Sequence, residues 1–510
     1  MIRFLVRRTA TGLVVLLVSS FLMYGMLSVS INPLQDLEES TAPNKAQLIA
    51  QRIQDLELDR PWIARFWDWL TGVVTGDLGV AWRSGREVES VMGDALIDTL
   101  QLVTAATFLA IFLGVAIGIA SALRQYSTFD YVITLVSFVL FSLPSFWVAV
   151  LLKQGGAIWF NTFLADPTLS YTTIIVIGVL TGLFWSLAVG GDVRRRLTVG
   201  GIAAAASIAV FAYLQESGWW SEPHISGVLF LLLSLATALV ITLLTTGLSN
   251  RRALLTGVAV VVVFLALHRW ISHGLFVDLT DSMTWGIIGL FVLGAVVVGM
   301  AVGAAFRGPD WVQSMRVGGM TGGIVMVFIV IDRCMRAWPA YFNANAISGR
   351  PIATMGSDTP NLGGNFWIQA IDMYTHLILP TLVLMLISFA QYTRYARGSM
   401  LEVLGQDYMR TARAKGLNER TVIMRHGFRN TLIPLATIAP VDVITLFGGA
   451  IITEQIFGRP GMGRLFVDSL NGAEMDPLMA YIVLTAALAV LANIVADMLY
   501  AALDPRIRLS

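Results

Sequence analysis

The sequence predicts an all-α polytopic membrane protein. Of its 510 residues, 56% are hydrophobic and only 13% are charged, whereas a soluble domain carries about 25% charged residues. The apolar residues are gathered in runs long enough to cross a bilayer as helices, at about 20 residues each. The formal net charge is +1, so nothing indicates a nucleic-acid partner. The single cysteine, Cys334, and the five scattered histidines predict no internal disulfide and no metal site.

The first predicted span is the apolar run 9–29. It follows Arg3, Arg7 and Arg8, and this positive flank puts the N-terminus in the cytoplasm. A secretory signal peptide is the alternative, but the run is longer than a signal core and no Ala-x-Ala cleavage site closes it. Residues 30–95 are polar and rich in tryptophan, which favours an extracytoplasmic loop with interfacial anchors.

Two further runs, 96–123 and 131–152, complete a predicted N-terminal core of three spans, residues 1–154. Pro144 lies inside the second of these runs. A proline inside a span kinks the helix and frees a carbonyl group, which is tolerated only against protein or a water-filled path. Lining of a pore and simple bending of the helix are both open interpretations of Pro144.

Residues 155–332 are predicted to add six spans. The apolar runs are 172–190, 198–214, 225–248, 253–267, 284–306 and 317–331. Their connecting turns alternate between basic, such as Arg194–Arg196, and acidic, such as Asp278 with Asp281. Positive turns stay inside, so the alternation fits six spans and gives twelve in the chain. No charged residue lies well inside these runs, which favours a peripheral role over a substrate path.

The remainder is predicted as an extracytoplasmic loop, residues 333–375, and a C-terminal core, residues 376–510, whose first apolar run leads inward from His376. Within this core, Asp442 lies inside the apolar run 432–453. An ionisable residue in a span is a candidate for function. Pairing with a polar group on a neighbouring helix is favoured over exposure to a transport path. Arg506 and Arg508 follow the last run, 478–502, and place the C-terminus in the cytoplasm.

A dense charged segment, residues 398–430, separates two of the C-terminal spans. Its basic excess predicts a cytoplasmic location. Leu401, Leu404, Tyr408 and Ala412 have helical spacing on one stripe, Gly416 suits a left-handed position after a helix, and Asn418 is a good N-cap. These features predict a helix, a tight turn and a second helix. An apolar stripe needs a cover, so a docking element is favoured over a solvated basic loop.

Four stretches carry a family resemblance: DYMRTARAKGL, RHGFRNTLIP, GGAIITEQIFGRPGMGRLF and LDPRIR. They are similar to the membrane subunit of dipeptide/oligopeptide-type ABC importers. The resemblance implies a type I ABC-importer-like core of six helices, to which about six inserted helices are added here. It also implies that residues 398–430 are the coupling segment, which docks on an ATPase subunit. The docking residues would be Asp407, Tyr408, Arg410, Thr411, Ala412, Arg413, Ala414, Lys415 and Gly416.

The same resemblance implies the partners and the location. A second homologous permease subunit, two ATP-binding subunits that hold ATP and Mg, and an extracytoplasmic solute-binding protein would assemble in a bacterial or archaeal inner membrane. The family's general Glu-Ala-Ala-x-x-x-Gly pattern matches here only at Ala412 and Gly416, with Arg410 and Thr411 at the other two positions. The loop after Thr453 would line the exit of the pore. The pore or gate candidates are Pro144, Asp442, Glu454, Phe457 and Gly461.

The predicted function is a permease subunit of an ATP-driven importer for peptides or a peptide-like solute. The chain has no G-x-x-x-x-G-K-[S/T] phosphate loop, so ATP hydrolysis would come from partner subunits and the chain itself is not an enzyme. An ion-coupled secondary carrier or another self-sufficient membrane protein is the alternative. It is disfavoured because the spans show no convincing internal repeat and no cluster of catalytic residues.

Overall fold

The computed structural model describes residues 2–189, 191–306, 308 and 310–503. Helices dominate this part of the chain, and one short hairpin supplies the strands that the structure shows there. Eleven of the described helical segments are long and apolar enough to cross a membrane. Each of the twelve predicted apolar runs overlaps a helix, although the run 131–152 is divided between two helices. The fold is therefore that of an all-α polytopic membrane protein.

The predicted extracytoplasmic loop, residues 30–95, is folded rather than irregular. Phe66 and Trp69 of this segment pack against Tyr24 of the first long helix and Met479 of the last. The two strands pair antiparallel, with Val80 opposite Glu87. The elements are α1 (Ile2–Ser30), α2 (Gln35–Glu38), α3 (Lys45–Asp55), α4 (Trp62–Thr75), β1 (Val80–Ala81), β2 (Arg86–Glu87) and α5 (Val88–Leu123).

The predicted span 131–152 is wrong as a single kinked helix. α6 (Thr128–Ser142) ends before Leu143, and α7 (Ser145–Lys153) begins after Pro144. Proline has no amide hydrogen to donate and forces the preceding residue into extended geometry, which Leu143 adopts with a ψ of 130°. α7, the π-helix η1 (Gln154–Trp159) and α8 (Phe160–Ala165) then form one helical path of 21 residues.

Residues 155–332 form two packed groups of helices. α9 and α10 pack on each other where Gly182 faces the backbone of Gly200. α11, α12, α14 and α15 share one hydrophobic core that also includes Trp367 and Ile371. The elements are α9 (Tyr171–Val189), α10 (Val193–Glu216), α11 (Gly227–Thr245), α12 (Arg251–Trp270), η2 (Ile271–Leu275), α13 (Phe276–Asp278), η3 (Thr280–Ser282), α14 (Trp285–Ala305) and α15 (Trp311–Phe342).

A buried ion network lies among these helices, just beyond the ends of the apolar runs. Asp332 of α15 is fully buried and accepts hydrogen bonds from Ser272 Oγ at 2.8 Å and Arg336 Nε at 2.9 Å. His268 Nε2 lies 3.3 Å from the same carboxylate. Asp332 lies one residue beyond the apolar run 317–331, so it does not contradict the prediction that no charged residue lies well inside the runs, but the helix continues past that run. Arg336, one turn later, supplies the opposite charge that a buried carboxylate requires.

The C-terminal core begins earlier than predicted. α15 ends at Phe342 and α16 starts at Phe366, so the expected loop 333–375 is irregular only over residues 343–365. The elements of this core are α16 (Phe366–Leu404), α17 (Asp407–Ala414), α18 (Glu419–Thr421), η4 (Val422–Gly427), α19 (Phe428–Phe457), α20 (Met462–Asn471) and α21 (Met475–Leu503).

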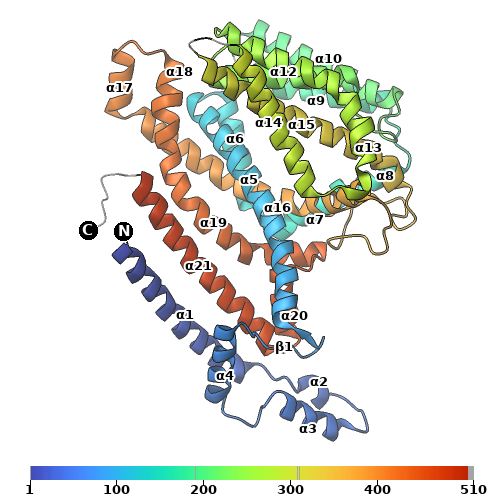
Figure 1. Ribbon diagram of the computed structural model, residues 1–510, viewed down its shortest axis with the longest axis vertical. Helices are drawn as coiled ribbons and strands as arrows, with labels where there is room; N and C mark the ends of the chain where they lie inside the picture. Colours follow the sequence, from blue (N-terminus) through green and yellow to red (C-terminus); the bar gives the residue numbers. More distant parts are fainter. Residues whose placement is uncertain (1, 190, 307, 309, 504–510) are drawn as a thin grey trace.

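The centre of the molecule is the contact between α5 and α16. Gly114 and Gly118 of α5 lie directly against the backbone of α16 at Tyr392 and Thr393. Small residues at such a crossing let two membrane helices approach closely. Figure 1 shows α17 and α18 at one end of the molecule, and α2, α3 and α4 at the opposite end. The two helices α5 and α16 therefore lie between these two ends of the molecule.

The α14–α15 contact provides a test of packing. A methyl group at Gly299 would overlap the Gly318 carbonyl oxygen, whereas one at Gly289 of the same helix would meet nothing within 4 Å. Both Gly→Ala changes raise helix propensity by up to about 1 kcal/mol. We expect Gly299→Ala to lower the free energy of unfolding by about 1–3 kcal/mol through overpacking. Gly289→Ala should not lower the free energy of unfolding.

Thermal unfolding of the purified full chain measures this difference. A Tm for Gly299→Ala that equals or exceeds the Tm of Gly289→Ala would contradict the observed helix contact.

Candidate functional site

The charged segment folds as a compact hairpin, which we call the basic hairpin (residues 407–421, α17 and α18). Gly416 ends the first helix with a φ of +74°, a left-handed conformation that glycine adopts without steric cost. Asn418 starts the second helix, and its side-chain oxygen accepts a hydrogen bond from Thr421 N at 2.8 Å. The turn and the cap lie where the sequence predicted them.

The expected apolar stripe is wrong in part. α16 ends at Leu404, and α17 starts anew at Asp407, so Leu401 and Leu404 belong to another helix. Met409 and Ala412 are the buried residues of α17. Tyr408 is 40% exposed, and its hydroxyl accepts a hydrogen bond from Asn430 Nδ2 at 2.9 Å. The break after α16 changes the phase of the helix, which a continuous helical spacing cannot anticipate.

The underside of the basic hairpin is held by a small core. Met409 and Ala412 pack against Val403 of α16 and Val422 of η4. The other predicted docking residues, Asp407, Arg410, Thr411, Arg413, Ala414, Lys415 and Gly416, are exposed. The hairpin therefore presents one open, mainly basic face while its apolar residues are already covered.

One ion pair braces the two helices of the hairpin. Arg413 Nη2 lies 2.9 Å from Glu419 Oε1, and Arg413 Nε also donates to Glu419 Oε2 at 3.1 Å. These hydrogen bonds from Arg413 lower the pKa of the Glu419 carboxyl below its ordinary value, so the carboxylate stays ionised at neutral pH. The basic hairpin also contacts the turn between α11 and α12, where the backbone of Gly247 lies against the Arg420 guanidinium.

A second group of polar residues closes the opposite end of α5 and α19. We call it the Glu454 layer (Asp98, Thr99, Glu454 and Arg459). Glu454 is fully buried and accepts a hydrogen bond from Thr99 Oγ1 at 2.7 Å. Thr99 Oγ1 in turn accepts one from Met462 N at 2.8 Å. Arg459, only 3% exposed in its side chain, pairs with Asp98 at 2.5 Å.

Two glycines allow this close arrangement. A side chain at Gly461 would overlap the Glu454 carboxylate, and one at Gly463 would collide with Ile451 at 2.6 Å. Phe457 is 2% exposed and packs with Val148 of α7. The structure thus brings Glu454, Phe457 and Gly461, three of the predicted pore or gate residues, into one buried region.

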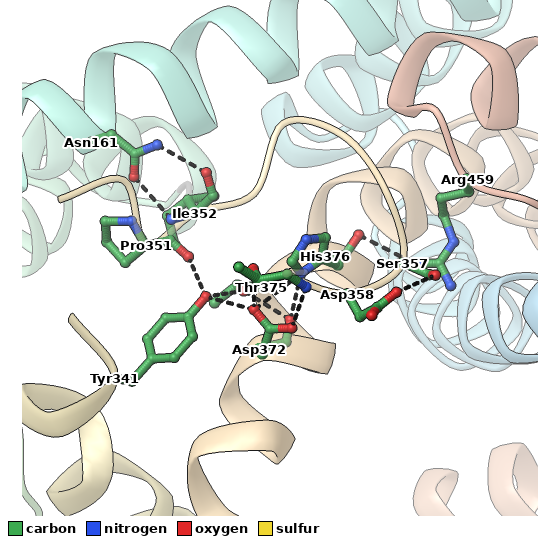
Figure 2. A network of polar contacts seen from close by, with 11 residues as sticks. Asn161, Tyr341, Pro351, Ile352, Ser357, Asp358, Asp372, Thr375, His376 and Arg459 are labelled. Atoms are coloured by element: carbon green, nitrogen blue, oxygen red, sulfur yellow. Dashed lines mark hydrogen bonds and ion pairs between the residues drawn. The ribbon is translucent and has the colours of Figure 1, made fainter. Parts of the chain in front are cut away.

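A hydrogen-bond network connects the Glu454 layer to the 343–365 loop, as Figure 2 shows. Asp372 of α16 accepts hydrogen bonds from Thr359 Oγ1 at 2.6 Å and Tyr341 hydroxyl at 3.2 Å. Arg459 Nη1 reaches the His376 carbonyl oxygen at 3.5 Å. This network was not predicted from the sequence, because Asp372 and Tyr341 lie in the stretch 333–375, which was predicted to be a loop.

The two remaining pore or gate candidates lie elsewhere. Pro144 is exposed at the break between α6 and α7. Asp442 of α19 is half-buried, and the nearby buried Tyr392 of α16 is its main polar neighbour. Neither residue contacts the Glu454 layer through a hydrogen bond between described residues. Their roles stay predictions.

A further ion pair fixes the basic-hairpin end of α16. Arg397 donates to both oxygens of Asp130, at 2.7 and 2.9 Å, and Ser121 Oγ donates to the same carboxylate at 2.5 Å. This bidentate pair joins α5, α6 and α16. Asp130 directly follows a short turn between two apolar runs. An acidic residue at the start of an apolar run could have indicated that a basic residue of a neighbouring helix pairs with it.

The described residues contain no group of three or more His, Cys, Asp or Glu side chains that could hold a metal ion. The arrangement is thus a many-helix membrane protein with an exposed basic hairpin at one end and a buried polar layer where α5 meets the end of α19. Its sequence matches the family of binding-protein-dependent transport system inner membrane components over residues 201–509. The N-terminal model of that component matches residues 1–112. The chain belongs to this family and is a membrane component of a transport system.

The curated relatives are permeases. The oligopeptide transport system permease protein OppB of Mycobacterium tuberculosis (strain ATCC 25618 / H37Rv) is 26% identical over 510 residues, which covers the whole of both chains. The oligopeptide permease AppB of Bacillus subtilis (strain 168) is 47% identical over 154 residues, 30% of this chain and 48% of AppB. The dipeptide permease DppB of Escherichia coli (strain K12) is 46% identical over 145 residues, 28% of this chain and 42% of DppB. The chain is accordingly a permease subunit.

The domain boundaries at residues 154, 332 and 375 stay predictions. The longer family match begins at residue 201, within the six helices of residues 155–332. That these helices are an insertion stays a prediction.

The Glu454 layer supplies a stability test. Thr99→Val keeps the shape of the side chain but leaves Glu454 and Met462 N without their shared partner. We expect a loss of about 1–3 kcal/mol in unfolding free energy, the usual cost of stranding a buried polar group. Thr162→Val is the matched control, because Thr162 is exposed and bonds only within its own helix.

Thermal unfolding of both variants in the same detergent gives the comparison. Equal Tm values for Thr99→Val and Thr162→Val would show that the layer does not hold the helices together.

Proposed function

We propose that the chain is the permease subunit of an ATP-driven importer for peptides or a peptide-like solute. The observation that carries this proposal is the basic hairpin, with its covered underside and open charged face, in a chain of this transport family. The names of the relatives support peptides as the substrate class, since OppB, AppB and DppB are oligopeptide and dipeptide permeases.

The basic hairpin is proposed to dock on an ATPase subunit. A protruding hairpin with its own small core moves as a unit, so force applied to its exposed face reaches α16 and η4 directly. Its charged face offers Arg410 and Lys415, whose side chains are free to meet a partner, apart from the long 3.7 Å contact of Arg410 with Asp407. ATP and Mg would be held by the docked subunits, because this chain lacks a phosphate loop.

The proposed assembly has four further subunits. A second, homologous permease completes the path, two ATP-binding subunits drive it, and an extracytoplasmic binding protein delivers the solute. Both termini and the basic hairpin face the cytoplasm, as the basic turns favour. The opposite end, with α2, α3 and α4, then faces the binding protein (Figure 1).

The Glu454 layer is proposed as the closed gate at the extracytoplasmic end. Glu454, Phe457 and Gly461 are packed together there, and no charged group among them is left exposed. Opening has to separate α5 from the α19–α20 turn, so nucleotide-driven movement of α16 would act on this layer through Asp372 and His376. Such coupling requires that nucleotide binding favours one of two conformations.

The turn of the basic hairpin gives the main functional test. Gly416→Val places a β-branched residue at positive φ, at a cost of about 1–3 kcal/mol. We expect ATP-driven peptide uptake to fall about tenfold or more in the assembled complex, while ATPase subunits still hydrolyse ATP. Gly218→Val is the matched control, because Gly218 has a φ of +63° and open space around it, in the turn after α10.

Charge reversal tests the docking face separately. We expect Arg410→Glu with Lys415→Glu to weaken ATPase co-purification and abolish uptake, because both side chains are exposed and neither braces the hairpin. Arg413 is left unchanged, since its loss would also free Glu419. Arg350→Glu, at an exposed site in the 343–365 loop and outside the basic turns, is the control.

Wild-type uptake and ATPase binding in the Arg410/Lys415 variant would reject the docking role. Uptake driven by an ion gradient without any ATPase subunit would reject the importer itself.

A further inference from the structure

A cavity of about 280 Å³ lies at the end of the molecule opposite the basic hairpin. It is enclosed by the end of α1, by α4, by the turn that leads to β1, and by the start of α21. Drug-sized pockets measure about 300–1,000 Å³. This cavity is therefore suited to a smaller molecule or group, of the size of an amino acid or a dipeptide. It shares no residue with the Glu454 layer.

Opposite charges line this cavity without pairing with each other. Asp476 accepts a single long hydrogen bond, from Val80 N at 3.4 Å. The Arg65 side chain forms no ion pair or hydrogen bond with any described residue, and its Nε is buried. A buried or half-buried charge without a partner is costly. Both groups face the same space, so a molecule that carries two opposite charges would satisfy both.

Two neutral groups that lack partners also line the cavity. Tyr24 is only 4% exposed, and its hydroxyl makes no hydrogen bond among the described residues. Tyr24 lines the cavity together with Arg65 and Asp476. Trp69, 8% exposed, has a buried indole N–H without an acceptor. Buried tyrosine and tryptophan polar atoms usually find a partner.

The remaining charges favour an ammonium group at one end of the ligand. Glu57 and Asp68 both pair with Arg60, which leaves one negative charge in excess. The exposed Asp55 and Asp77 have no ion pair among the described residues. The unpaired carboxylates thus outnumber Arg65. A purely anionic ligand would be repelled, and a guanidinium at the centre would still bind one carboxylate or phosphate.

We propose that this cavity binds a small zwitterion, with its ammonium group at Asp476 and its acidic group at Arg65. Tyr24 and Trp69 supply the neighbouring hydrogen bonds. A free amino acid or dipeptide and the headgroup of an ethanolamine phospholipid share this chemistry. The site lies outside the proposed gate, so it is a property of this chain beyond its transport role.

Calorimetric binding to the full chain in phosphatidylglycerol nanodiscs tests the proposal, with three probes that differ by one charge each. Ala-Ala is zwitterionic, N-acetyl-Ala-Ala lacks the ammonium group and Ala-Ala-amide lacks the carboxylate. We expect Ala-Ala to bind at least about tenfold more tightly than either blocked peptide, since a hydrogen bond to a charged group is worth about 1.5–3 kcal/mol. No ATPase is present, so the result is independent of the importer proposal.

Variants assign each charge to its partner. In Asp476→Asn, N-acetyl-Ala-Ala should bind as tightly as Ala-Ala. In Arg65→Gln, Ala-Ala-amide should bind as tightly as Ala-Ala. Tyr24→Phe should weaken Ala-Ala by several-fold without changing either preference. Asp281→Asn and Arg195→Gln, both exposed and distant in sequence, should leave all affinities unchanged.

The same titrations in phosphatidylethanolamine discs distinguish the two sources. If the headgroup occupies the cavity, Ala-Ala binds more weakly in phosphatidylethanolamine discs than in phosphatidylglycerol discs. In Asp476→Asn and in Arg65→Gln, this difference between the two lipids should disappear. Equal affinity for Ala-Ala in both lipids supports a soluble ligand. Equal affinities for the three peptides would overturn the proposal. So would the absence of any peptide binding, if native mass spectra also show no bound ethanolamine lipid.

Discussion

The close approach of α5 to α16 is the contact on which the rest of the structure depends. Without side chains at Gly114 and Gly118, the α5 backbone lies directly on α16. In a bilayer the lipid tails are as apolar as the helices, so association depends on packing rather than on exclusion of water. α16 carries the basic hairpin at one end and Asp372 at the other. Because it is held along its length by α5, it is suited to transmit a displacement between the two ends.

Three aspartates inside this helical assembly follow one physical rule, which is that each meets a basic side chain from another element. Asp130 pairs with Arg397, Asp98 with Arg459, and Asp332 with Arg336 and His268. Removing one partner of a buried pair is far more costly than never having the pair. These contacts therefore fix which helices are neighbours, whereas the apolar cores alone would tolerate several arrangements. The cavity with Arg65 and Asp476 departs from the rule, and this departure is the reason for assigning it a ligand.

Much of the fold could be predicted from the sequence, because helices in a membrane are marked by long apolar runs and basic turns. The basic hairpin was also predictable, since Gly416 and Asn418 are local signals that need no tertiary information. Partners were not predictable, because Asp332 finds its neighbours on α12 and on the turn before α11, far away in the sequence. The position of Met409 was missed for another reason. A helix break at Gly405 resets the helical phase, and spacing alone does not reveal it. The π-helical turns gave no recognisable signal in the sequence.

The packing of α1 has a consequence for how the chain is made. α1 rests mainly on α21 and α4, and Arg8 lies 3.1 Å from Asp497. Almost the whole polypeptide is translated between these two helices. During cotranslational insertion, α1 must wait in the bilayer without its principal neighbour until the ribosome has finished α21. A nascent chain that stalls late would thus leave α1 unattached, which gives membrane quality-control proteases a specific mark of an incomplete molecule.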